Sequence, residues 1–123
     1  MQLVWMPRAR RQRHAAIEYI AQDNQGAALD VLDRIEHQTD MLLDHPELGR
    51  PGRKQGTREL VISRTPFIAV YRVRPKAKRI ELLLLLHSSQ QWPTAKALES
   101  LADPVPNVEH GQVMREAQAL AGK

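Results

Sequence analysis

The sequence predicts an α+β domain in which an N-terminal helical hairpin packs on a four-stranded, mainly antiparallel sheet in the order β-α-α-β-β-β. Between residues 9 and 43, two segments repeat apolar residues at helical spacing. Between residues 56 and 87, three runs have the composition of consecutive strands. The 123 residues suffice for one two-layer core. We therefore expect one folded body over residues 1–93 and a helical tail over residues 94–123.

The first strand and the first helix are expected on either side of Pro7. The apolar run at residues 2–5 is typical of a short strand, and proline is favoured in the first turn of a helix. Helical periodicity then continues from Ala9 to about Asp23. The outer side of this helix is expected to carry Arg10, Arg11 and Arg13.

The second helix is expected over residues 28–43, where apolar residues recur at positions i, i+3, i+4 and i+7. Pro46 should end it, because proline disfavours helical geometry at the preceding residue. The link at Asp23 and Asn24 is so short that the two helices must be antiparallel. They should cover one face of the sheet.

The remaining strands are expected within residues 56–62, 67–73 and 80–86. Alternation in the middle strand puts one set of side chains on one face, namely Phe67, Ala69, Tyr71 and Val73. The other face receives Ile68, Val70 and Arg72. The run Leu82–Leu86 is apolar without alternation, which predicts a central strand covered on both faces.

Charge is unevenly distributed along the chain. Residues 1–93 hold 15 Lys and Arg against 10 Asp and Glu, whereas residues 94–123 hold 3 against 4. A sheet that displays cations is suited to an anion or an acidic protein surface, although a solvated basic face is the simpler alternative. The slightly acidic tail is suited to lie on the basic body.

Several functional classes are disfavoured. The chain has no cysteine, so disulfides and thiolate sites are excluded. Its five histidines lack metal-ligand spacing, so we expect no metal and no cofactor. No signal peptide is visible, and no apolar run approaches the roughly 20 residues of a membrane helix. We expect a soluble, cytoplasmic protein with no membrane partner.

Four motifs resemble the RelE/ParE toxin superfamily over residues 1–93. They are His-Pro-Glu-Leu-Gly-Arg-Pro at 45–51, Gly-Thr-Arg-Glu-Leu-Val at 56–61, Val-Tyr-Arg-Val at 70–73, and Leu-His at 86–87 followed by Trp92. His45 stands where that family often has Phe. The resemblance implies the toxin of a type II toxin–antitoxin (plasmid stabilisation) module, which inhibits growth until a cognate antitoxin binds it.

The superfamily has two branches with different targets. Ribosome-dependent messenger-RNA interferases usually carry an arginine where this chain has Ile68, so the resemblance favours the ParE branch, which poisons DNA gyrase. On the interferase alternative, the chain would act on mRNA at the ribosome, with Tyr71 and His87 as candidate acid–base groups. A non-toxic module that binds an antitoxin or a nucleic acid is a third alternative.

The resemblance also nominates a set of target-binding residues, namely Arg58, Glu59, Arg64, Arg72 and Trp92. Two of them have a structural alternative, because Trp92 would pack in the core and Glu59 would pair with Arg58. The acid–base candidate Tyr71 would also pack in the core. His87 could likewise be a packed strand-end residue. Leu84 and Gln90 replace two arginines common in ParE-like sequences, which leaves open whether toxicity is retained.

The tail has a resemblance of its own. Part of residues 94–123 is similar to the toxin-binding segment of antitoxins, at Val108, His110, Val113, Met114, Ala117 and Leu120. Our hypothesis is that this tail packs on the body in cis or on a neighbouring copy, which would make a homo-oligomer. An ordinary C-terminal helix that completes the core is the alternative.

Overall fold

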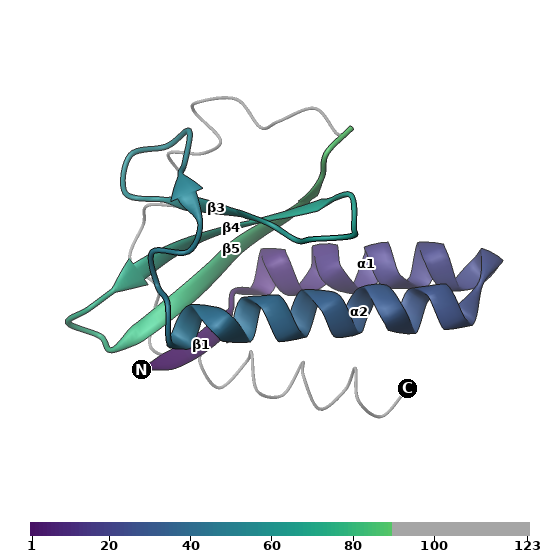
Figure 1. Cartoon of the computed structure of the whole chain (residues 1–123), viewed down its shortest axis with the longest axis horizontal. Coiled ribbons are helices and arrows are strands. Elements are labelled where there is room, and N and C mark those ends of the chain that lie inside the picture. Colours follow the sequence, from purple (N-terminus) through teal and green to yellow (C-terminus); the bar gives the residue numbers. More distant parts are fainter. Residues whose placement is uncertain (90–123) are drawn as a thin grey trace.

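The computed structural model describes residues 1–89, which form a two-helix hairpin on one face of a five-stranded sheet (Figure 1). The elements in chain order are β1 (Gln2–Trp5), α1 (Pro7–Asp23), α2 (Gln25–Asp40), the 3₁₀ turn η1 (Met41–Leu43), β2 (Arg50–Pro51), β3 (Arg58–Val61), β4 (Phe67–Arg74) and β5 (Arg79–His87). The strand order in the sheet is β1-β5-β4-β3-β2.

The predicted α+β class and helical hairpin are confirmed, and the sheet has one strand more than the sequence predicts. The additional strand is β2, in the connector after η1, where the run Gly-Arg-Pro-Gly at residues 49–52 is typical of a turn. Its two residues pair with β3, Arg50 opposite Glu59 and Pro51 opposite Arg58. Two residues are too short a stretch to show any alternation, so periodicity cannot reveal such a strand. The sheet is mixed because β1 runs parallel to β5, and its other pairs are antiparallel.

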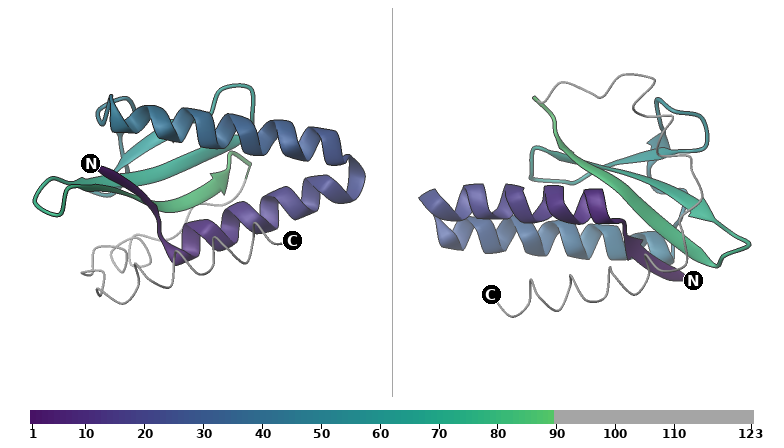
Figure 2. Two further views of the ribbon diagram at one scale, coloured as in Figure 1. Left: turned by 90° about the horizontal axis from the view of Figure 1, so that it is seen from below. Right: turned by 180° about the vertical axis from the view of Figure 1, so that it is seen from behind.

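The hairpin forms for the local reasons that the sequence suggests. Pro7 occupies the start of α1, where a missing N–H costs no hydrogen bond. Asn24 links the helices and caps α2, because its Oδ1 accepts a hydrogen bond from Ala27 N at 3.0 Å. Regular α-helix ends at Asp40, earlier than predicted, because η1 forms the last turn before Pro46. Both helices lie on the same face of the sheet (Figure 2).

One expectation for α1 is wrong. Arg10 was expected on the outer side of the helix, but it is 3% exposed. The first turn of α1 is held against the sheet edge, because Met6 N donates to Leu82 O and Arg10 N donates to Met6 O, both at 2.9 Å. Ala9 and Arg10 are therefore buried at this turn, whereas Arg8 is exposed. Arg13 lies 4.5 Å over the ring of Trp5, in a cation–π contact.

The main core lies between the hairpin and the sheet. Ile35 of α2 and Leu42 of η1 pack with sheet side chains from β3, β4 and β5. As the alternation predicts, Phe67, Ala69 and Tyr71 of β4 belong to this core, and Val73 packs at its margin.

Strand β5 is buried on both faces, as its unbroken apolar run predicts. Val70 pairs with Leu84 but Tyr71 pairs with Leu82, so Leu83 is an extra residue in a β-bulge. Leu82 and Leu85 consequently join the main core. A second apolar cluster contains Leu83, Leu84 and Leu86 of β5 together with Val4 of β1, Val70 of β4 and Met6, the residue before α1. We call the side of the sheet that carries this cluster, opposite the helices, the second face.

Within residues 1–89, neither helix is long and apolar enough to cross a membrane. The same part of the chain holds no group of three or more His, Cys, Asp or Glu side chains arranged to bind a metal ion.

Candidate functional site

Tyr71 fastens the connector between α2 and β3 onto the sheet. Its side chain is fully buried, and its hydroxyl donates to Pro46 O at 2.8 Å and accepts from Gly49 N at 2.9 Å. A Cβ on residue 49 would lie 2.7 Å from Tyr71 Cε1, so only glycine permits this approach. The structural alternative for Tyr71, packing in the core, is confirmed. Its hydroxyl, being engaged on both sides, is poorly placed to move a substrate proton.

Arg58 and Glu59 secure the same connector. Arg58 Nη1 donates to Gly49 O at 2.8 Å. Glu59 is 3% exposed and accepts from Arg50 Nη2 at 3.1 Å and from Arg53 N at 2.9 Å. The ion pair between Glu59 and Arg58 that the sequence suggested is wrong, because adjacent residues of a strand point to opposite faces.

These contacts form one unit, which we call the connector clamp: Pro46, Gly49, Arg50, Arg58, Glu59 and Tyr71. Its members come from three of the four family-like motifs. The motif residues therefore have a clear structural task, which is to hold a short irregular segment against β3 and β4.

A hydrogen-bonded charge cluster occupies the second face at the β4–β5 hairpin. Glu81 is fully buried, and its Oε1 accepts from Arg72 Nε. Its Oε2 lies 2.8 Å from Arg79 Nη2, and Arg74 Nη1 lies 3.9 Å from Oε1. We call Glu81, Arg72, Arg74 and Arg79 the Glu81 cluster. Three cations around one buried carboxylate leave this end of the sheet basic.

The Glu81 cluster was not predicted, although the sequence contains a signal for it. An antiparallel hairpin closed by a turn at residues 75–78 pairs Arg74 with Arg79, and two residues further on it pairs Arg72 with Glu81. Cross-strand neighbours of opposite charge could have been found from this register.

Arg64 and His87 lie at the other end of β4. Arg64 is exposed in the β3–β4 turn with φ of 63°. Gln38 of α2 braces this turn, because its Oε1 accepts from Ser63 N at 2.7 Å and its Nε2 donates to Ser63 O at 3.2 Å. His87 ends β5, where its ring meets Phe67 edge-on at 5.4 Å and its Nδ1 accepts from Ser89 N at 3.1 Å.

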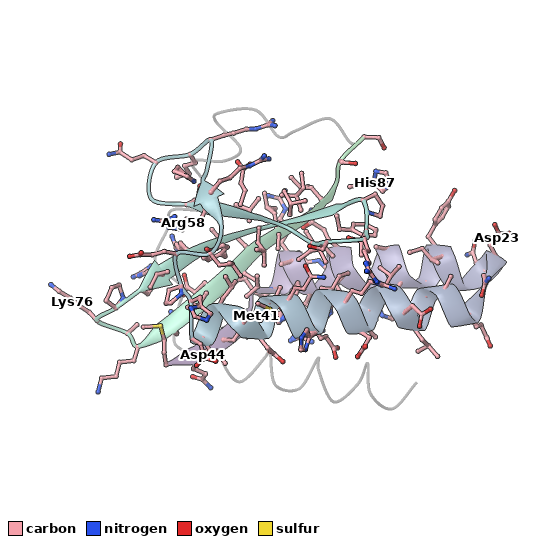
Figure 3. The ribbon with its side chains drawn as sticks, in the orientation of Figure 1. Asp23, Met41, Asp44, Arg58, Lys76 and His87 are labelled. Atoms are coloured by element: carbon pink, nitrogen blue, oxygen red, sulfur yellow. The ribbon has the colours of Figure 1, made fainter. Side chains whose placement is uncertain are left out.

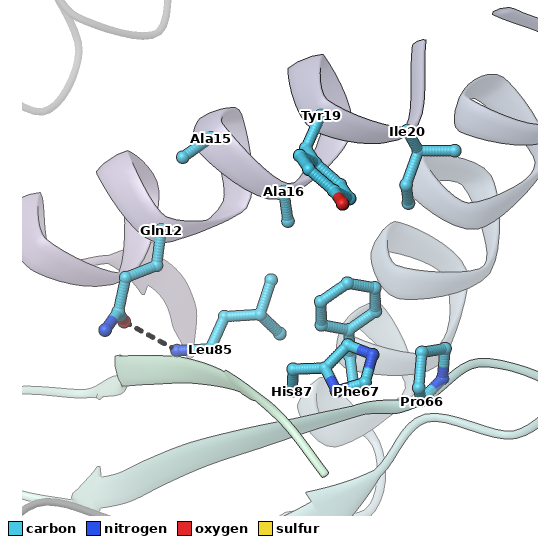
Figure 4. Close-up of a pocket in the computed structure, with 9 residues that line it drawn as sticks. All are labelled: Gln12, Ala15, Ala16, Tyr19, Ile20, Pro66, Phe67, Leu85 and His87. Atoms are coloured by element: carbon cyan, nitrogen blue, oxygen red, sulfur yellow. Dashed lines mark hydrogen bonds between the residues drawn. The ribbon is translucent and has the colours of Figure 1, made fainter. Parts of the chain in front are cut away.

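His87 also lines an open apolar pocket of about 430 Å³ between α1 and the end of the sheet (Figure 4). Gln12 borders the pocket, and its Oε1 accepts from Leu85 N at 2.9 Å, which satisfies a strand N–H beyond the end of β1. The remaining lining residues carry one further polar group, the hydroxyl of Tyr19. The described part of this pocket therefore surrounds His87 with apolar surface.

The structure does not bring the predicted site residues together. Phe67 pairs with His87 and Tyr71 with Leu82, so Tyr71 and His87 lie about four positions apart along the sheet, on the order of 13 Å. Arg72 follows Tyr71 and points to the opposite face. Figure 3 shows Arg58 well away from His87, and Lys76 at the far end of the sheet from it. Trp92, Gln90 and the six tail residues, from Val108 to Leu120, lie outside the described residues.

The clamp gives a direct stability prediction. Tyr71→Phe should lower the free energy of unfolding by about 2–3 kcal/mol, because a buried N–H and a buried C=O both lose their partner. Burial raises the pKa of Tyr71 above its ordinary value. The folded state then holds the proton more tightly than the unfolded state, so this contribution is complete below pH of about 10 and is lost as pH rises through the higher folded pKa.

Urea unfolding of the wild type and Tyr71→Phe at neutral pH and above pH of about 10 measures both effects. The difference in unfolding free energy between the two proteins should shrink at the higher pH. Tyr19→Phe is the control, because Tyr19 is 77% exposed and should show neither effect. A constant difference across the pH range would contradict the proposed role of the hydroxyl.

Comparison with known proteins identifies this combination of fold and motifs. A solved chain described as "Chromosomal ParDE TA system from P. aeruginosa" superposes with a TM-score of 0.62 at 29% identity, covering 71% of this chain and 95% of that one. A protein of Sinorhizobium fredii named "Putative toxin Y4kP" is 40% identical over 89 residues, 72% of this chain and 90% of its own length. The fold and these similarities define the chain as a toxin of a toxin–antitoxin system.

The family follows from a third comparison. The family model described as "ParE toxin of type II toxin-antitoxin system, parDE" matches residues 3–92. The chain belongs to the ParE toxin family, and the resemblance that its motifs indicated is confirmed. The match ends at residue 92, so residues 94–123 lie outside the part of the chain that the family model matches.

Proposed function

We propose that this chain inhibits growth by binding and poisoning DNA gyrase, and that a cognate antitoxin neutralises it. The observation that carries the choice of target is the separation of the groups that RNA cleavage would need. The hydroxyl of Tyr71 is engaged in the connector clamp. His87 lines the apolar pocket at the other end of β4, and Arg72 is bound to Glu81 on the opposite face of the sheet. A protein that poisons its target by binding needs no convergent acid, base and cation. A gyrase target also places its action in the cytoplasm.

Arg64 is the target-binding candidate best supported by geometry. Of the four candidates within residues 1–89, Arg58, Glu59 and Arg72 have structural partners, whereas Arg64 is exposed at a turn that Gln38 braces. A rigid turn loses little backbone entropy on binding, and the planar guanidinium that it carries is suited to pair with the carboxylates of an acidic protein surface. We therefore propose that Arg64 contacts the target.

Induction in a sensitive host tests the proposal with two readouts, DNA supercoiling with breakage and the integrity of transcripts on ribosomes. We expect broken DNA and intact transcripts. Arg64→Ala should weaken the effect at least several-fold, whereas Lys76→Ala, at an exposed cation in the other hairpin, should leave it unchanged. Lys76→Ala controls for the loss of one positive charge.

Each other result overturns a defined part of the proposal. Cleaved transcripts with intact DNA would replace gyrase by the ribosome and its messenger RNA. Normal growth with both readouts unchanged would refute toxicity, as expected for an inert antitoxin-binding or nucleic-acid-binding module. Equal effects of Arg64→Ala and Lys76→Ala would remove Arg64 as a specific contact.

A further inference from the structure

The second face of the sheet is apolar at its centre and has no described helix over it. Val4 of β1, Val70 of β4, and Leu84 and Leu86 of β5 lie side by side there, each less than a tenth exposed. The described helices are on the opposite face, where Ala9, Ile35 and Leu42 belong to the main core. The second face is therefore a buried surface whose cover does not come from α1 or α2.

A surface of this kind requires a cover in water. Val and Leu side chains exposed to water are unfavourable, so this cluster would destabilise the fold if nothing covered it. Large contiguous apolar patches on soluble chains mark sites where another segment or partner packs. The question is which segment occupies this one.

The chain itself supplies a suitable occupant. Residue 90 follows directly after the turn that ends β5, the strand that contributes most to the second cluster. The sequence predicts a helix at residues 110–121 with one apolar stripe: Val113, Met114, Ala117, Leu120 and Ala121. Such a helix is about 18 Å long and fits along the nine residues of β5, which span about 30 Å.

Charge favours the same pairing. The Glu81 cluster, with three arginines and one carboxylate, carries a net positive charge beside the apolar residues of the second face. Residues 94–123 hold 4 Asp and Glu against 3 Lys and Arg, whereas the body is basic. Electrostatic attraction between the slightly acidic tail and the Glu81 cluster adds to the apolar contact. This attraction would weaken as the salt concentration rises.

We propose that residues 94–123 dock on the second face of their own chain and cover the cluster formed by Val4, Val70, Leu84 and Leu86. The stripe from Val113 to Ala121 supplies the apolar contact. A partner segment that binds the same face then has to displace this tail, which makes the tail a built-in competitor for that surface. The proposal concerns contacts within the chain and does not depend on the cellular target.

A spin label on the full chain tests the proposal. The chain has no cysteine, so Ala119→Cys, which lies away from the predicted stripe, gives a single attachment site. We expect a nitroxide there to broaden the NMR amide signals of Leu84 and Leu86 in β5 while sparing those of Asp33 and Glu36 in α2. The effect should be unchanged on dilution.

A mixed sample separates packing in cis from packing in trans. Spin-labelled chains without isotope are mixed with isotope-labelled chains without a spin label. Broadening of Leu84 and Leu86 in the mixture would overturn the proposal in favour of a homo-oligomer formed through the tail. Broadening of α2 in the dilute sample, or no broadening, would overturn it as well.

A pair of full-length variants provides a second measurement. Leu120→Asp places a charge in the stripe and should raise the fluorescence of a hydrophobic dye several-fold, because the second face becomes accessible. Ala119→Asp introduces the same charge outside the stripe and should leave the fluorescence near the wild-type value. Equal fluorescence for the two variants would contradict docking through the stripe.

Discussion

Replacing Glu81 by alanine is expected to lower the free energy of unfolding by about 3–5 kcal/mol, since removing one partner of a buried ion pair leaves a buried charge without its counter-ion. Glu81 is fully buried, and the side chain of Arg72 that binds it is 10% exposed. Arg79, 2.8 Å from the other carboxylate oxygen, is also largely buried. Removal of this one carboxylate thus disturbs two cations that water reaches poorly. Urea or thermal unfolding measures the loss.

Glu59→Ala is the matched control. Glu59 is as deeply buried as Glu81, but its partners Arg50 and Arg53 have side chains 55% and 52% exposed. Those cations are solvated when the carboxylate is removed, so we expect a smaller loss, on the order of 1 kcal/mol. A double variant, Arg72→Leu with Glu81→Leu, should recover part of the stability, because it removes the more deeply buried cation together with the carboxylate and leaves Arg79 without that counter-ion. Equal losses for the two single variants would show that burial of the cations is unimportant.

The sequence predicted the fold well wherever a long periodic pattern existed. The helical repeats gave α1 and α2, and the alternation in β4 assigned Phe67, Ala69 and Tyr71 to the correct face. The bulge at Leu83 was invisible, because a run of identical leucines carries no periodic signal that an extra residue could interrupt. Strand β2 could not be predicted either, because two residues have no periodic pattern of their own. Their pairing with β3 depends on the contacts of the connector clamp.

The candidate site was less predictable because its residues have partners distant in sequence. Arg58 and Arg72 look alike as basic residues on strands, but one binds the connector carbonyl of Gly49 and the other binds Glu81. The expectation that the arginines together display a cationic sheet surface is therefore wrong for Arg72, which is buried against Glu81, whereas Arg58 is partly exposed. The family assignment stands without that surface, because the motifs and the comparisons carry it.

Leu84→Arg should be among the most damaging single substitutions, with an expected loss of about 3 kcal/mol or more, because it would bury a guanidinium without a carboxylate. The resemblance to ParE-like sequences implies an arginine at this point of the last strand, so the substitution would introduce the residue that the resemblance implies. In this chain, however, Leu84 is 1% exposed and packs in the second cluster with Val70 and Leu86. The departure from the family pattern thus agrees with an apolar second face.

Two controls make this test specific to burial. Leu84→Met keeps the apolar volume and should cost less than about 1.5 kcal/mol. Val61→Arg places the same guanidinium on the same face at a position 50% exposed, where it can reach water, and should change stability by about 0.5 kcal/mol or less. If Leu84→Arg proved as stable as Val61→Arg, water would have access to the centre of the second face, and neither the buried cluster nor its proposed cover could be maintained.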